Sequence, residues 1–145
     1  MFKTILLPTD GSDLSDKATA TAVEFAKLHR SKLVGITVIQ PLPLSSMGDG
    51  GAVIDSGQFA LKMQDAARGY IDKVAAAARA ADIPFEGVIS VSHTPYEEIV
   101  EAAKKFECDL IMMASHGHKG INKLLLGSQT DKVLAHTTLP VLVLR

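Results

Sequence analysis

A glycine-rich stretch late in the chain holds the residue types best suited to binding a phosphate. It covers residues 114–130 and reads ASHGHKGINKLLLGSQT. Glycines let backbone N–H groups approach a ligand closely, and the start of a helix presents unpaired N–H groups and a positive dipole end. The hydroxyls of Ser128 and Thr130, together with basic side chains, strengthen this character. A plain strand-to-helix loop with Ser128 as its N-cap explains the spacing equally well.

A second polar cluster follows the first apolar run of the chain. Pro8, Thr9 and Asp10 come directly before Gly11 and Ser12, so a carboxylate and hydroxyls separate a predicted strand from a predicted helix. In open α/β sheets, ligands bind outside the carboxyl ends of the strands where the strand order reverses. We therefore expect Asp10 to face the glycine-rich stretch across one crevice. The alternative is that Asp10 only accepts hydrogen bonds from backbone N–H groups at the helix start.

Both clusters need a scaffold, and the hydrophobic pattern predicts one. Short apolar runs alternate with stretches of helical period, which is typical of a parallel sheet with crossover helices. The expected strands are residues 3–8, 32–39, 85–91, 109–113 and 140–144, and the first two helices are 12–30 and 58–81. We predict one Rossmann-like α/β domain over residues 1–145, with an open five-stranded parallel sheet in the order 3-2-1-4-5 and helices on both faces.

The starts of the last two helices carry capping signals. Thr94 and Glu97 have the spacing of a capping box, with Pro95 at the first helical position. Ser128 is a good N-cap for the last helix. The Pro-, Gly- and Ser-rich residues 41–57 are expected to form a long mobile loop inside the domain.

Composition excludes several classes of protein. The chain has 145 residues, 47% hydrophobic and 21% charged, with a formal net charge of −1. This length supports a hydrophobic core without disulfides, and the near-neutral charge argues against nucleic acid as a partner. The single cysteine, Cys108, excludes an internal disulfide and fits a reducing compartment. Without a signal peptide or an apolar run long enough for a membrane helix, we expect a cytoplasmic protein with no membrane partner.

The whole chain resembles the universal stress protein family. The resemblance rests on the opening residues 5–12 (ILLPTDGS), on TVI at 37–39, on Pro95, and on the glycine-rich stretch through PVLV at 140–143. Nucleotide-binding members of that family share the loop G-x2-G-x9-G-[S/T]. Gly117, Gly127 and Ser128 match this loop, while Ala114 occupies the first glycine position. The alanine matters only if that position needs a positive φ angle or a very close phosphate approach.

The resemblance implies an adenine-nucleotide site that holds ATP or AMP, with Mg²⁺ bridging the phosphates when the ligand is ATP. Asp10 would bond the ribose or the adenine edge, and the backbone of Val38 would meet the adenine edge. The remaining residues that would shape the pocket or hold the phosphates are Pro8, Thr9, Met113, Ala114, His116, Gly117, Gly127, Ser128, Gln129 and Thr130. The resemblance also implies a homodimer.

Signals for catalysis or for a metal are lacking in the sequence. It contains neither a G-x-S-x-G nucleophile elbow nor a Walker loop. No general base is identifiable, because Asp10 is expected to bind the sugar or base and not to activate water. His116 and His118 have no third ligand at a fixed spacing. We therefore assign no catalytic residue and no protein metal site, and we expect at most slow hydrolysis of ATP.

Three functions stay open on these observations. The first is a stress-response protein that binds an adenine nucleotide and acts through its bound state or its partners. The alternative is a nucleotide-free interaction protein of the same fold, and the third is a nucleotide hydrolase or adenylating enzyme.

The last apolar run, residues 140–144, is an edge strand in the predicted order and has few features that would prevent it from pairing with another chain. It predicts an antiparallel two-fold homodimer through Val141–Leu144. The alternative is an edge covered by residues 41–57 or by the last helix.

Overall fold

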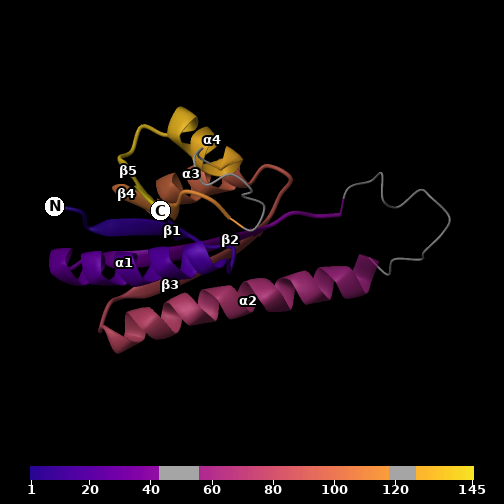
Figure 1. Ribbon diagram of the computed structural model, residues 1–145, viewed down its shortest axis with the longest axis horizontal. Helices are drawn as coiled ribbons and strands as arrows, with labels where there is room; N and C mark the ends of the chain where they lie inside the picture. The colour runs from indigo at the N-terminus through magenta and orange to yellow at the C-terminus, as the bar shows by residue number, and fades with distance from the viewer. Residues whose placement is uncertain (43–55, 118–126) are drawn as a thin grey trace.

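Five parallel strands form one sheet whose order is β3-β2-β1-β4-β5 (Figure 1). The computed structural model describes residues 1–42, 56–117 and 127–145. In chain order the elements are β1 (Thr4–Pro8), α1 (Asp13–His29), β2 (Lys32–Ile39), α2 (Ser56–Ala80), β3 (Phe85–Val91), α3 (Pro95–Lys105), β4 (Leu110–Ala114), α4 (Ser128–His136) and β5 (Val141–Leu144). The predicted fold class and strand order are confirmed.

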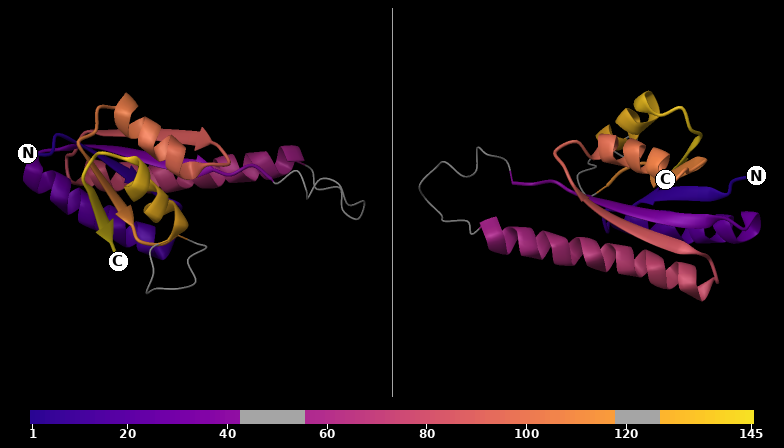
Figure 2. Two further views of the ribbon diagram at one scale, coloured as in Figure 1. Left: turned by 90° about the horizontal axis from the view of Figure 1, so that it is seen from above. Right: turned by 180° about the vertical axis from the view of Figure 1, so that it is seen from behind.

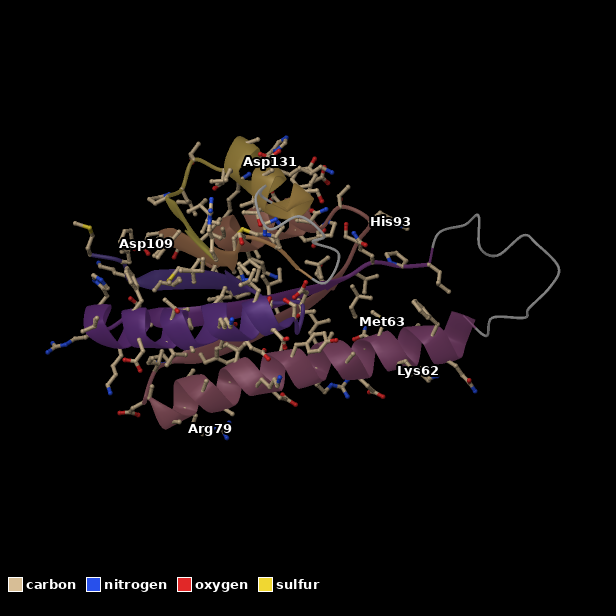
Figure 3. The ribbon with its side chains drawn as sticks, viewed as in Figure 1. Lys62, Met63, Arg79, His93, Asp109 and Asp131 are labelled. Atoms are coloured by element: carbon tan, nitrogen blue, oxygen red, sulfur yellow. The ribbon has the colours of Figure 1, made fainter. Side chains whose placement is uncertain are left out.

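The strand order reverses beside β1. It pairs with β2 through Leu6 and Val34 on one side and with β4 through Leu6 and Ile111 on the other, both in parallel. The carboxyl ends of β1 and β4 therefore lie next to each other, and we call this end of the sheet its carboxyl edge. At the opposite end of β4, Asp109 accepts hydrogen bonds from the backbone N–H groups of Lys3 and Thr4, 2.8 and 3.1 Å long (Figure 3).

Helices α1 and α2 cover one face of the sheet (Figure 2). Ala22 and Ala26 of α1 and Val74 and Ala78 of α2 are buried there against alternate residues of the central strands, such as Leu7. Burying each large aliphatic side chain stabilises the fold by about 1.5–3 kcal/mol. The small alanines let both helix backbones approach the sheet.

Helices α3 and α4 cover the other face. Ile99 and Ala103 of α3 and Val133 of α4 pack there against Leu6 and Ile111. Because β1 and β4 are covered on both sides, consecutive residues in them are apolar and buried. This explains why their sequences lack the alternation of a strand with one wet face.

Thr94 and Pro95 open α3 as predicted, but the capping box does not form, and the predicted N-cap of α4 is wrong by one residue. Thr94 is the N-cap of α3, but its side chain makes no capping hydrogen bond; its hydroxyl donates to the Glu97 carboxylate. Ser92 Oγ already accepts from the Thr94 N–H, the donor that Glu97 would satisfy in a capping box. In α4 the N-cap is Gly127, and Ser128 is the first helical residue.

The long loop is shorter at one end than the sequence predicts. Helix α2 begins at Ser56, so the last two residues of the expected 41–57 loop are helical. Residues 43–55 of that loop lie outside the described residues. No helix in the described ranges is long and apolar enough to cross a membrane.

Candidate functional site

Asp10 stands in the turn between β1 and α1, and its carboxylate holds that turn together. Its Oδ1 atom accepts hydrogen bonds from the Ser12 N–H at 3.0 Å and from the Ser15 hydroxyl at 2.9 Å. The preceding residue is fixed as well, since the Thr37 hydroxyl donates to the Thr9 carbonyl at 2.9 Å. Asp10 therefore does satisfy donors at the helix start, as the structural alternative predicts, with one of its two oxygens.

The second carboxylate oxygen of Asp10 faces the glycine-rich stretch. A Cβ atom built on Gly117 would overlap Asp10 Oδ2, so the two residues touch just beyond the carboxyl ends of β1 and β4. Only glycine fits this position without displacing the carboxylate. Asp10 therefore lies against Gly117, the first residue of the loop that we expected it to face.

Tyr70 of α2 packs on the same turn, a contact that the sequence did not predict. Gly11 has a φ angle of +75°, and a Cβ atom there would overlap the Tyr70 ring. Glycine at this position meets both demands, because it tolerates positive φ and leaves room for the ring. In the sequence, Asp10 and Gly11 indicate a turn. Nothing in the sequence indicates that Tyr70, 59 positions further along the chain, packs on that turn.

The two described ends of the glycine-rich stretch meet at the carboxyl end of β4. The Gly127 N–H donates to the Ser115 carbonyl at 2.7 Å, and the Thr130 hydroxyl donates to the Ala114 carbonyl at 2.9 Å. A Cβ atom on Gly127 would lie 2.9 Å from the Ser115 oxygen and 3.3 Å from His116 Cα, tighter than side chains normally pack. Glycine therefore sets how closely the start of α4 approaches β4.

Residues 118–126, between these ends, lie outside the described residues. They include His118, Lys119 and Lys123, which gave the stretch its basic character. Ala114, at the first glycine position of the family loop, belongs to β4 and is not among the residues with positive φ. Alanine thus causes no backbone strain there.

His116 follows β4 and carries a buried polar atom. Its Nδ1 lies 3.0 Å from the Ser115 hydroxyl. Its Nε2 is buried and has no hydrogen-bond partner among the described residues. A buried nitrogen without a partner is uncommon and costly in folded proteins, and it often marks the place of a ligand or water.

Two residues predicted to hold phosphates use their side chains elsewhere. The Gln129 carboxamide oxygen accepts the backbone N–H of Tyr96 in α3, at 3.0 Å. The Thr130 hydroxyl is buried and bonded to β4, as above. What the first turn of α4 still offers is backbone N–H groups, which have no partner within a helix. The side chain of Ser128, by contrast, is exposed.

The other predicted site residues lie around the ends of the central strands. Met113 and Ala114 are buried at the end of β4, and Pro8 is half-buried at the end of β1. Val38 is half-buried near the end of β2 and packs against the core on the α3 and α4 face. The structure thus brings the predicted residues to the carboxyl edge of neighbouring strands.

Two ionisable groups outside this edge have perturbed pKa values. Burial, reinforced by the Asp109 carboxylate, raises the pKa of the Cys108 thiol from its ordinary value of 9.0 to about 11. The pKa of Tyr96 is raised mainly because its hydroxyl donates to the Glu97 carboxylate at 3.1 Å. Within the described residues, no group of three or more His, Cys, Asp or Glu side chains could hold a metal ion.

Known families, proteins and structures resemble this chain over its whole length. The model of the universal stress protein family matches residues 1–145. A universal stress protein of Thermus aquaticus is 36% identical over 146 residues, covering 100% of each chain. The solved structure of MJ0577, a universal stress protein of Methanocaldococcus jannaschii, has a TM-score of 0.83 at 28% identity and covers 99% of this chain and 96% of that one.

Two further structures share the fold and contain a nucleotide. A universal stress protein in complex with cAMP has a TM-score of 0.71 at 24% identity, with 99% of this chain and 97% of that chain covered. The protein from Archaeoglobus fulgidus in complex with dAMP has a TM-score of 0.66 at 16% identity, with 100% and 98% covered. At these identities the likeness shows a common fold. Taken with the match of the family model over the whole length, it leads to one conclusion: this chain belongs to the universal stress protein family.

Proposed function

We propose that this protein binds an adenine nucleotide, ATP or AMP, in the cytoplasm, and acts in the stress response through its bound state or its partners. The observation that carries the proposal is the meeting of Asp10 with Gly117, beside the contact of Gly127 with Ser115. Each contact needs glycine, and both lie at the carboxyl ends of β1 and β4. The solved relatives that hold cAMP and dAMP support the same ligand class.

The phosphates would bind at the start of α4. Backbone N–H groups and the positive end of the helix dipole favour an anion there. The buried Nε2 of His116, without a partner among the described residues, would supply one more polar contact. Glycine at position 127 would let the phosphates and the helix start approach β4 closely.

The nucleoside would bind nearer to β1 and β2. The Asp10 carboxylate would accept hydrogen bonds from the ribose hydroxyls or the adenine amino group, and the backbone of Val38 would meet the adenine edge. Pro8, Thr9 and Met113 would form the adjoining wall. Mg²⁺, if the ligand is ATP, would be held by the phosphates, so we assign it no protein ligand.

We propose a binding protein in preference to an efficient enzyme. Dedicated enzymes turn over on the order of 1 to 1,000 times per second and need a group that activates the attacking water. The Asp10 carboxylate lies at this edge, and its Oδ1 already bonds to Ser12 and Ser15. We therefore expect at most slow hydrolysis of ATP.

One observation favours the nucleotide-free alternative. The side chains of Gln129 and Thr130 have protein partners without any ligand. In that case the protein would keep the fold and serve only as an interaction module. Mass spectrometry of the small molecules released from protein purified without added nucleotide separates the two, because the binding proposal expects an adenine nucleotide.

The direct test compares two glycine-to-alanine variants by calorimetric titration with ATP and AMP. Gly127→Ala puts a methyl group 2.9 Å from the Ser115 oxygen, so it should weaken binding at least about tenfold. Gly69→Ala makes the same chemical change on α2, where nothing lies within 4 Å of the new methyl, and should bind as the wild type does. Equal affinity of both variants would exclude this helix start from the site.

A further inference from the structure

Helix α3 is capped by a side chain from helix α4. The backbone N–H of Tyr96 lies in the first turn of α3, where helix donors have no partner within the helix. It donates to Gln129 Oε1 at 3.0 Å, across 33 positions of sequence. The N-cap residue Thr94 makes no capping bond with its own side chain. Gln129 therefore accepts a hydrogen bond from the first turn of α3, as the side chain of an N-cap residue usually does.

The same face of α4 also holds the Tyr96 ring. The Lys132 ammonium lies 5.6 Å from the centre of that ring, and the His136 ring centre lies 4.7 Å from it. Residues 129, 132 and 136 follow the i, i+3, i+7 spacing of one helix face. Tyr96 is thus contacted along most of α4, and the two helices lie side by side (Figures 1 and 2).

The first turn of α4 is held from two directions. Toward the sheet, Gly127 and Thr130 bond to the end of β4. Toward α3, the described contact is the bond from Tyr96 to Gln129. The turn itself is closed by the Asp131 N–H, which donates to the Gly127 carbonyl at 3.0 Å. Removing the Gln129 acceptor would leave the turn attached on the β4 side.

We propose that Gln129 and Tyr96 are positioning residues for the nucleotide site. The Gln129 side chain does not bind the phosphates; it fixes the first turn of α4 against α3, so that the backbone N–H groups of that turn point to one place. A binding site gains affinity when the groups around it lock its donors before the ligand arrives. This inference rests on the proposed function, because it assigns how the phosphate end of that site is held.

The test uses Gln129→Met, which keeps the length of the side chain and removes the oxygen acceptor. Gln129→Glu keeps an oxygen in the same place, and Glu101→Met introduces the same methionine at an exposed position of α3 as a matched control. Two quantities are measured: the affinity for ATP, and hydrogen exchange at the Tyr96 and Asp131 amides by NMR. Because exchange needs no nucleotide, it reports on the positioning independently of binding.

The proposal expects Gln129→Met to lose protection at both amides and to bind ATP about three- to tenfold more weakly, the worth of one hydrogen bond. Gln129→Glu should keep the protection, and Glu101→Met should behave as the wild type.

Weaker binding with unchanged protection would make Gln129 a direct ligand and overturn the proposal. Lost protection at Tyr96 with unchanged Asp131 exchange would also overturn it. Absence of binding of both ATP and AMP in the wild type would instead refute the proposed function, and the exchange data would still decide the positioning.

Discussion

Asp10 has two tasks at the scale of a single residue. One oxygen bonds to Ser12 and Ser15 and thereby shapes the start of α1, while the other lies against Gly117. A short acidic side chain is suited to both, because it can accept several hydrogen bonds at once. The structural and functional interpretations of this residue are therefore compatible.

Asp10→Asn separates the two tasks. Asparagine keeps an oxygen that can accept from Ser12 and Ser15, but more weakly because it is neutral, so the free energy of unfolding in urea should fall by about 1–2 kcal/mol. Loss of the charge should weaken adenine-nucleotide binding about 10- to 100-fold, because hydrogen bonds to a charged acceptor are the stronger ones. Calorimetric titration measures the affinity. An asparagine variant that binds like the wild type would place the carboxylate outside the site.

Cys108 is buried, and its burial makes a testable prediction about its reactivity. Its thiol is 6% exposed, and a pKa raised to about 11 keeps it protonated and unreactive near neutral pH. Because the folded pKa is the higher one, the neutral thiol contributes stability below about pH 9, and this contribution is lost as the pH rises toward 11. Iodoacetamide at pH 8.5 should therefore label the native protein far more slowly than the protein in guanidinium. Equal labelling rates would contradict the burial of the thiol.

At the scale of the elements, α2 contains a glycine that its helix does not need. Gly69 is exposed, and a Cβ atom there would meet nothing within 4 Å. Glycine in a helix interior costs about 0.5–1 kcal/mol relative to alanine. Gly69→Ala should therefore raise the free energy of unfolding by that amount in urea titrations. A destabilised variant would mean that α2 makes a contact at this position in solution, for example with a second chain.

At the scale of the whole molecule, β5 is an edge of the sheet. In its pairing with β4, the carbonyls of Pro140 and Leu144 accept from the N–H groups of Ile111 and Ser115. Backbone groups alternate in direction along a strand, so those of residues 141 and 143 point away from β4. Leu142 is 39% exposed. We propose that a second copy pairs with this edge, antiparallel about a two-fold axis.

Proline tests this dimer, because it removes an N–H without removing a carbonyl. Val141→Pro combined with Val143→Pro should leave the bonds to β4 in place and convert the dimer into a monomer of 15.4 kDa. Light scattering at micromolar concentration measures the mass. Val91→Pro at the opposite edge, β3, is the matched control and should remain dimeric. A monomeric wild type would refute the dimer, and a dimeric double variant would place the interface elsewhere.

The sequence by itself determined the order of the strands in the sheet and the end of the sheet at which the proposed site lies. Strands buried on both faces must be apolar throughout, and helices that cover them must repeat with helical period, so both leave a pattern along the chain. The carboxyl ends of parallel strands lie together, so the strand order alone predicts that Asp10 lies near the start of the glycine-rich stretch, where it contacts Gly117.

Only the tertiary structure decided which side chains meet. The bond from Tyr96 to Gln129 and the contact of Tyr70 with Gly11 join residues far apart in sequence, and neither pair has a spacing that a local pattern could show. The capping box at Thr94 is absent for a related reason. The Thr94 N–H, which Glu97 would accept in a capping box, donates to the Ser92 hydroxyl. Side-chain partners depend on competition among all groups that the fold brings within reach, and local sequence specifies only some of those competitors.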